Sequence, residues 1–113
     1  AIADFNKALE MQPDNSGILN NLAWVLATSP DDKLRDAERS IQLGAKACEV
    51  TGYKAPHILS TLASGYAEKG DFETAVKWSS KAVELSTGDS KDQLRKELES
   101  YQQKKVWCEK QEA

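Results

Sequence analysis

The stretch LSTLASGY at residues 59–66 decides the fold, because its large residues recur at helical spacing. Leu59, Leu62 and Tyr66 are separated by three and four residues and therefore share one face of a helix. The stretch LNNLAWVL at residues 19–26 has the same pattern, and an alanine follows the second leucine in both copies. Two copies of one helical pattern in a single chain indicate a repeat architecture.

A second pattern occurs three times: Lys, Ala, a small or apolar residue, Glu and an apolar residue. The copies start at positions 7, 46 and 81, at intervals close to the ~34 residues of a helix–turn–helix repeat. Turn residues and prolines at the segment edges divide the chain into helices predicted at 1–12, 16–28, 34–51, 56–69, 72–86 and 90–108. The sequence therefore predicts an all-α fold of about six helices, stacked in antiparallel pairs as a right-handed α–α superhelix.

These positions resemble the tetratricopeptide repeat (TPR) family. Its helix A carries a large residue, two spacers, Leu-Gly/Ala, two spacers and Tyr, and its helix B carries Ala-x3-aromatic, a second small residue and a closing Pro. The second complete repeat matches at Leu59, Leu62, Ala63, Tyr66, Gly70, Phe72, Ala75 and Ala82, the first at Leu19, Leu22, Ala23, Leu26 and Ala47, and a preceding helix B at Ala1, Phe5, Ala8 and Pro13. The resemblance covers about residues 1–87 and is to a bacterial-type fragment with a C-terminal capping helix.

The resemblance implies one TPR-like domain over residues 1–113. We expect helix B of a truncated repeat at 1–15, a repeat with a long connection between its two helices at 16–54, a second full repeat at 55–88, and a capping helix with a tail at 89–113. Because the chain begins without Met, we expect it to be an excised piece of a longer protein.

Two features depart from the family pattern. Residues 29–36 make the first connection about five residues too long, either as a tolerated surface loop, because added loop length costs little free energy, or as a contact loop. Gly44 and Ser79 replace the usual aromatic residue of helix B, and we expect weaker packing there.

The helix ends carry their own signals. Asp71 is predicted to cap the fifth helix, and Ser90 with Gln93 to form a capping box for the sixth. Leu94 and Tyr101 begin and end an apolar stripe on that last helix, whose other surface is predicted to be polar and to close the solenoid. The polar residues of that surface are Lys91, Lys96, Glu97, Gln102 and Gln103.

Composition excludes several classes of function. With 15 Lys+Arg against 18 Asp+Glu, the net charge of −3 argues against a nucleic-acid or anionic-membrane binder. The longest apolar run, residues 22–27, is far shorter than the ~20 residues of a membrane span. Cys48 and Cys108 have no metal-ligand spacing and are expected to be free thiols, which favours a cytoplasmic setting.

No arrangement of residues indicates catalysis. His57 is the single histidine, and neither cysteine lies in a motif that would activate it. No glycine-rich phosphate loop is present. We therefore expect no enzymatic activity, no catalytic residue, no metal site and no cofactor.

What remains is the concave groove that A helices line in TPR proteins. Carrying the family's groove positions over indicates Asn20, Trp24, His57, Ser60 and Ser64, and Arg95 of the capping helix borders them. Trp24 is either a binding residue or a groove filler packed on the next A helix. Family members that clamp a C-terminal carboxylate use Lys and Asn at matching positions, so clamping of that kind is not supported here.

Two functions follow from these observations. The first is a protein-interaction module that binds a peptide or partner helix in its groove; the alternative is a structural segment, or a regulatory tail of a larger multidomain protein. A second surface comes from the first helix, whose own helix A is missing. Its residues Ile2, Phe5 and Leu9 cannot all face the next helix, which predicts self-association unless that helix simply frays.

Overall fold

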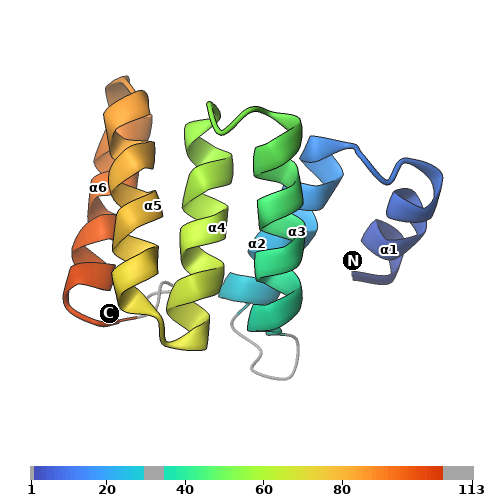
Figure 1. Cartoon of the computed structure of the whole chain (residues 1–113), viewed down its shortest axis with the longest axis horizontal. Helices are drawn as coiled ribbons and strands as arrows, with labels where there is room; N and C mark the ends of the chain where they lie inside the picture. The colour runs from blue at the N-terminus through green and yellow to red at the C-terminus, as the bar shows by residue number, and fades with distance from the viewer. Residues whose placement is uncertain (1, 30–34, 106–113) are drawn as a thin grey trace.

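The computed structural model describes residues 2–29 and 35–105, apart from the side chain of Ile2, and these form six helices (Figure 1). The helices are α1 (Ile2–Met11), α2 (Ser16–Thr28), α3 (Ala37–Val50), α4 (Pro56–Lys69), α5 (Phe72–Leu85) and α6 (Gly88–Gln102). The described part of the chain contains no strand. The expected all-α repeat fold is confirmed.

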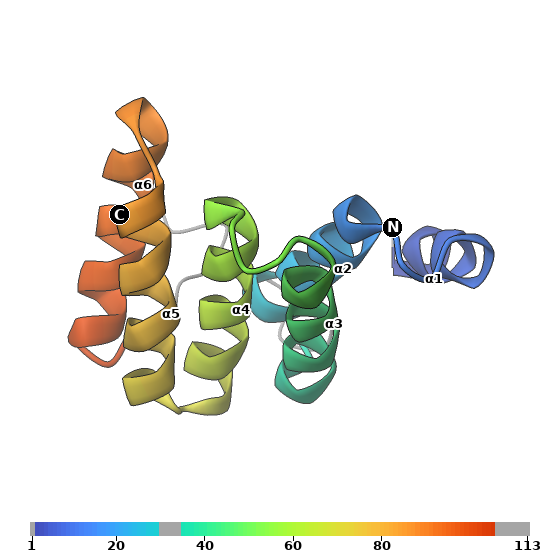
Figure 2. The same ribbon diagram turned by 45° about the horizontal axis from the view of Figure 1, so that its top comes forward.

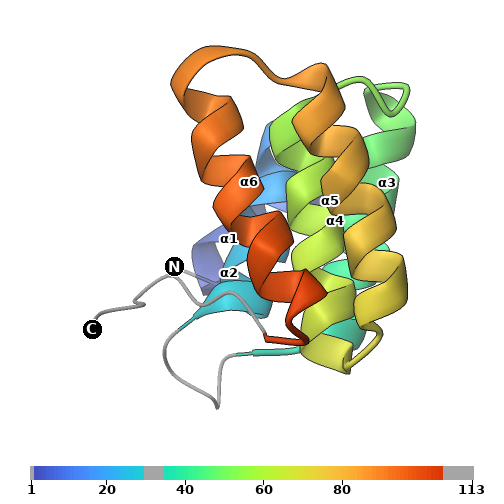
Figure 3. The same ribbon diagram turned by 90° about the vertical axis from the view of Figure 1, so that its left-hand side faces the viewer.

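The helices stand in two layers with α4 at the centre. Helix α4 packs against α2, α3 and α5, and α6 packs against α5. Seen along the row from the α6 end, α2 and α6 lie on one side and α3 and α5 on the other (Figure 3). Nine of the fourteen residues of α4 are buried, including Ser60 and Ser64. A helix surrounded on several sides needs small residues, and α4 supplies them with serine, threonine, alanine and glycine.

The predicted small positions lie where helices cross. Ala23, Ala63 and Ala82 are completely buried. At Gly65, an added Cβ would lie 3.0 Å from Ile41 Cγ1 and 3.3 Å from the Ile41 backbone nitrogen. Glycine therefore lets α3 and α4 approach more closely than any other residue would allow.

The two missing aromatic residues have different consequences. A Cβ added at Gly44 would lie 3.4 Å from Leu62 Cα, which is ordinary contact, so α4 fills the space that an aromatic ring would take. The expectation of weaker packing is therefore wrong at Gly44. Ser79 is buried, and its hydroxyl has no hydrogen-bond partner among the described residues, which is an unfavourable arrangement.

The ends of several helices follow from capping residues, and some predicted boundaries shift. Asp71 caps α5 as expected, because its carboxylate accepts a hydrogen bond from Thr74 N at 3.2 Å. Asp36 caps α3 in the same way, so this helix begins at residue 37 rather than 34. The connection before it lies largely outside the described residues, which exclude 30–34.

The predicted bounds of the last helix are wrong at both ends. Helix α6 begins at Gly88, where the backbone is left-handed with φ 64°, so Ser90 lies inside the helix and forms no capping box. The helix ends at Gln102 rather than at 108. Lys104 has a left-handed backbone with φ 59°, which does not continue a helix.

Helix α1 stands at the far end of the row and packs against α2 (Figure 2). Phe5 and Leu9 are half-buried, and Met11 at its end is 77% exposed. Arg39 of α3 donates a hydrogen bond to the Asn6 side chain and ties α1 to the second layer. The side chain of Ile2 lies outside the described residues, and self-association through this helix stays a prediction.

No helix in residues 2–29 or 35–105 has both the length and the apolar character that crossing a membrane requires.

Candidate functional site

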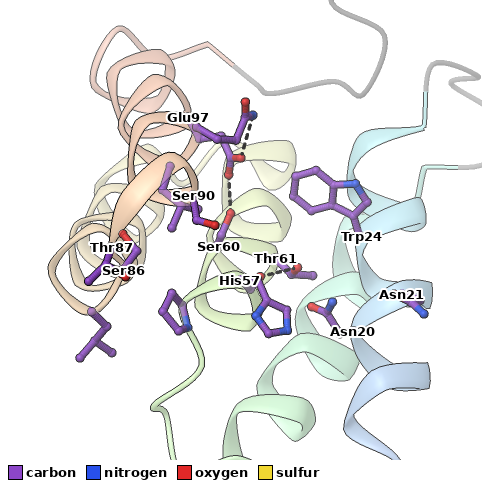
Figure 4. Close-up of a pocket in the computed structure, with 14 residues that line it drawn as sticks. Asn20, Asn21, Trp24, His57, Ser60, Thr61, Ser86, Thr87, Ser90 and Glu97 are labelled. Carbon is purple, nitrogen blue, oxygen red and sulfur yellow. Dashed lines mark hydrogen bonds between the residues drawn. The ribbon is translucent and has the colours of Figure 1, made fainter.

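Helices α2, α4 and α6 surround an open cavity of about 580 Å³ (Figure 4). Helix α2 forms one wall, the start of α4 forms the floor, and α6 with the connection before it forms the opposite wall. The described lining residues are Asn20, Asn21, Trp24, Pro56, His57, Ser60, Thr61, Leu85, Ser86, Thr87, Ser90, Gln93, Leu94 and Glu97. Four of the six predicted groove residues are among them: Asn20, Trp24, His57 and Ser60.

Trp24 forms the aromatic part of this site. Its indole projects from α2 into the space between α2 and α6 (Figure 4). The side chain is half-buried, whereas its helix neighbours Leu22, Ala23 and Leu26 are buried in the core. A large ring held in place by a rigid helix and still accessible from the cavity can contact a bound molecule.

Asn20 lies one turn before Trp24 on the same face of α2. Its side-chain oxygen Oδ1 is buried and has no hydrogen-bond partner among the described residues. Buried polar atoms are nearly always hydrogen-bonded in folded proteins, so an unpaired one on a cavity wall is a candidate contact for a ligand. The backbone oxygen of Trp24 already has a partner, because Thr28 Oγ1 donates to it at 2.7 Å.

The wall opposite Trp24 carries Glu97 of α6, a residue predicted to lie on the polar outer surface of that helix. Glu97 of α6 is only 3% exposed, and that prediction is wrong. Ser60 Oγ donates to Glu97 Oε1, and Gln93 Nε2 donates to Glu97 Oε2 at 3.2 Å. The sequence held a signal for this position, because Glu97 lies three residues after Leu94 and four before Tyr101, on the buried face of α6.

The other two predicted groove residues do not line the cavity. Ser64 is buried beneath α6, where its Oγ lies 2.8 Å from Tyr101 Oη and donates to Ser60 O at 3.1 Å. Arg95 is exposed on α6 and is not among the described lining residues. The capping helix thus covers Ser64 and leaves Asn20, Trp24 and His57 accessible from the cavity.

His57 is exposed at the mouth of the cavity, and its backbone oxygen accepts a hydrogen bond from Thr61 Oγ1 at 3.0 Å. Residues 2–29 and 35–105 contain no group of three or more His, Cys, Asp or Glu that could hold a metal ion. Cys48 is buried, and burial raises the pKa of its thiol to about 11, so it stays protonated at neutral pH. Cys108 lies outside the described residues.

Comparison with known families gives one result. Residues 5–42 match the model of a family described as tetratricopeptide repeat. The matched residues run from α1 through α2 and the long connection into α3. No curated protein and no solved structure matches the chain.

Proposed function

We propose, from the match of residues 5–42 to the tetratricopeptide repeat model, that this chain binds a linear peptide or a partner helix in the cavity between α2, α4 and α6. Tetratricopeptide repeats generally act as protein–protein interaction modules and are typically non-catalytic. The partner is therefore a protein, and the proposal concerns where on this chain it binds.

The observation that carries the proposal is the position of Trp24. Its indole is half-buried and projects into a cavity of about 580 Å³. Interfaces derive most of their binding energy from a few aromatic and arginine residues that become fully desolvated in the complex. A peptide side chain lying on the indole would complete its burial.

Asn20 supports the same location. An amide side chain both donates and accepts hydrogen bonds, which suits the peptide groups of an extended segment. Binding would also provide a partner for the buried Oδ1 of Asn20, at a site where the described residues provide none. The aromatic and the amide group lie one helical turn apart, so one short segment reaches both.

A selection experiment tests the proposal. Random linear peptides displayed on phage are selected on the full chain, and the affinities of the enriched peptides are measured for the parent and for Trp24→Ala. We expect Trp24→Ala to weaken binding by ~2 kcal/mol or more, roughly thirtyfold in Kd.

The matched control is Trp78→Ala, because Trp78 is also half-buried but lies on α5, where it stacks on Tyr53 with ring centroids 5.7 Å apart. This variant should keep the parent's affinity. Equal losses in the two variants, or selected peptides that ignore Trp24, would rule out the cavity as the binding site.

A further inference from the structure

We propose, building on the proposed function, that α6 is a displaceable cover of the concave face of α4, and that the protein partner displaces it on binding. The cavity beside Trp24 would be the part of the binding surface that is accessible before α6 moves. The face beneath α6, which carries Ser60 and Ser64, would become accessible afterwards. The inference concerns the regulation of the site and therefore goes beyond its location.

The first argument is where α6 lies. Ser64 holds the repeat position in α4 that Trp24 holds in α2, and Ser60 corresponds in the same way to the residue four positions before Trp24. These positions therefore belong to one concave surface. Helix α6 stands on the same side of the molecule as α2 (Figure 3) and leaves Ser60 3% and Ser64 2% exposed. It occupies the place that a segment bound along both helices would need.

The second argument is how α6 is held on α4. Helix α6 packs against α5, and it reaches α4 through side chains. The Ser60 and Glu97 side chains are hydrogen-bonded to one another, and Tyr101 Oη lies 2.8 Å from Ser64 Oγ. Such bonds replace hydrogen bonds to water in the uncovered state, so their net contribution is small whichever oxygen carries the proton. Polar groups of a partner can replace them in the same way.

The third argument is what α6 covers. The concave face of α4 beneath it presents small hydroxyl groups, and Ser64 Oγ donates to Ser60 O at 3.1 Å. This bond lies within α4 and does not depend on α6. Hydroxyl groups are compatible with water, so uncovering them costs much less free energy than uncovering leucine side chains would.

Two buried side chains of α6 make the closed arrangement the stable one. Leu94 is 6% exposed, and Tyr101 is completely buried in a cluster with Ala63, Ala67 and Ala75. The open arrangement is therefore a minor state, and a partner that binds only this state shifts the population toward it.

The start of α6 provides a hinge. Two residues, Ser86 and Thr87, join α5 to α6, and Thr87 forms no side-chain cap hydrogen bond. Gly88 follows with a left-handed backbone, φ 64°, which glycine adopts without strain. Hinges consist of a few residues at the ends of elements, where changes in φ and ψ are absorbed.

Hydrogen exchange measured by mass spectrometry tests the proposal on the full chain. A peptide selected for Trp24-dependent binding is added at saturation, and exchange of the backbone amides is compared with and without it. We expect amides in the middle of α6 to exchange roughly tenfold faster in the complex, because displacement opens their hydrogen bonds, and those of α2 to exchange more slowly. A fixed wall of the cavity would instead be protected by the peptide. Trp24→Ala with the same peptide is the control and should show neither change.

A variant gives a second measurement. Tyr101→Phe removes the contact with Ser64, and Tyr101 is not among the described residues that line the cavity. This variant should bind the same peptide roughly threefold more tightly, because the open state becomes more populated. The matched control is Tyr66→Phe, at a half-buried tyrosine of α4, which should keep the parent's affinity.

The outcomes separate the two proposals. Slower or unchanged exchange of α6 in the complex, or an unchanged affinity of Tyr101→Phe, would overturn this inference and leave the proposed function intact. Absence of any Trp24-dependent peptide would overturn the proposed function and, with it, this inference. The exchange comparison needs only the parent chain, so it decides the question even if Tyr101→Phe does not fold.

Discussion

Helices α2 and α4 have the same pattern of core residues, but the residues on their concave faces differ in how far they are exposed. Trp24 of α2 occupies the position that Ser64 holds in α4, and Asn20 corresponds to Ser60. Ser60 and Ser64 are 3% and 2% exposed, whereas Trp24 and Asn20 are only half-buried and line the cavity. Small hydroxyl groups let α6 lie against α4, and the bulkier pair on α2 faces the cavity that α6 leaves beside it. Equivalent repeat positions are thus buried by packing in α4 and remain accessible from the cavity in α2.

The largest expected effect distinguishes the two faces of α2. Leu22 is completely buried, and Leu22→Ala should lower the free energy of unfolding by ~2–5 kcal/mol through loss of burial and creation of a cavity. Trp24→Ala should cost less, because the indole is only partly buried. Urea denaturation measures both variants. If Trp24→Ala is as destabilising as Leu22→Ala, Trp24 is a core residue and the proposed binding site loses its anchor.

The next largest effect on stability is expected where α4 packs against α5. Ala63 is completely buried in a cluster with Ala67, Ala75 and Tyr101. Ala63→Leu should cost ~1–3 kcal/mol, because the larger side chain overpacks a site that has no room for it. Ala3→Leu, at an exposed position of α1, is the control and should be nearly neutral. A thermal melting curve of Ala63→Leu that matches the parent would disprove the assignment of this crossing.

A smaller effect tests whether α6 closes the concave face of α4. Tyr101 is completely buried, and its hydroxyl lies 2.8 Å from Ser64 Oγ. Tyr101→Phe removes this contact without changing the ring, and we expect a loss of about 0.5–1.5 kcal/mol in chemical denaturation. Tyr66→Phe, at a half-buried tyrosine of α4, should change stability less. The opposite ranking would mean that the polar contact does not hold α6 in place.

The smallest expected effect on stability appears only at high pH and concerns the buried thiol of Cys48. Cys48 of α3 contacts Ile58 O of α4 at 3.9 Å, and burial raises the pKa of its thiol from 9.0 to about 11. Between these values the unfolded chain loses the proton while the folded chain keeps it. This contribution to stability is therefore complete below pH 9 and falls as the pH rises toward 11. Cys48→Ala should show a smaller loss of stability over this range, and an equal loss in both proteins would contradict the shift.

Residue pattern was sufficient to predict the helices and most of their limits. The recurrence of leucines and alanines at three and four residues located α2, α4 and α5 to within one residue at each end. Local capping chemistry explains this success: Asp71, for example, accepts from a backbone N–H only three residues away. Such interactions join residues that are close in the sequence, so the sequence predicts them. The resemblance to the tetratricopeptide repeat family is confirmed at residues 5–42.

The concave face depended on contacts between distant segments. Ser60 meets Glu97, and Ser64 meets Tyr101, across 37 residues of sequence in each case. The spacing of Leu94 and Tyr101 indicates the buried face of α6, but no local pattern shows which helix that face covers, so Glu97 was assigned to the surface and Ser64 to an open groove. The sequence by itself determined the helices, their repeat and the small residues at the crossings, because these depend on helical periodicity. Only tertiary packing decided that α6 buries a carboxylate opposite Trp24, because that placement depends on how three helices fit together.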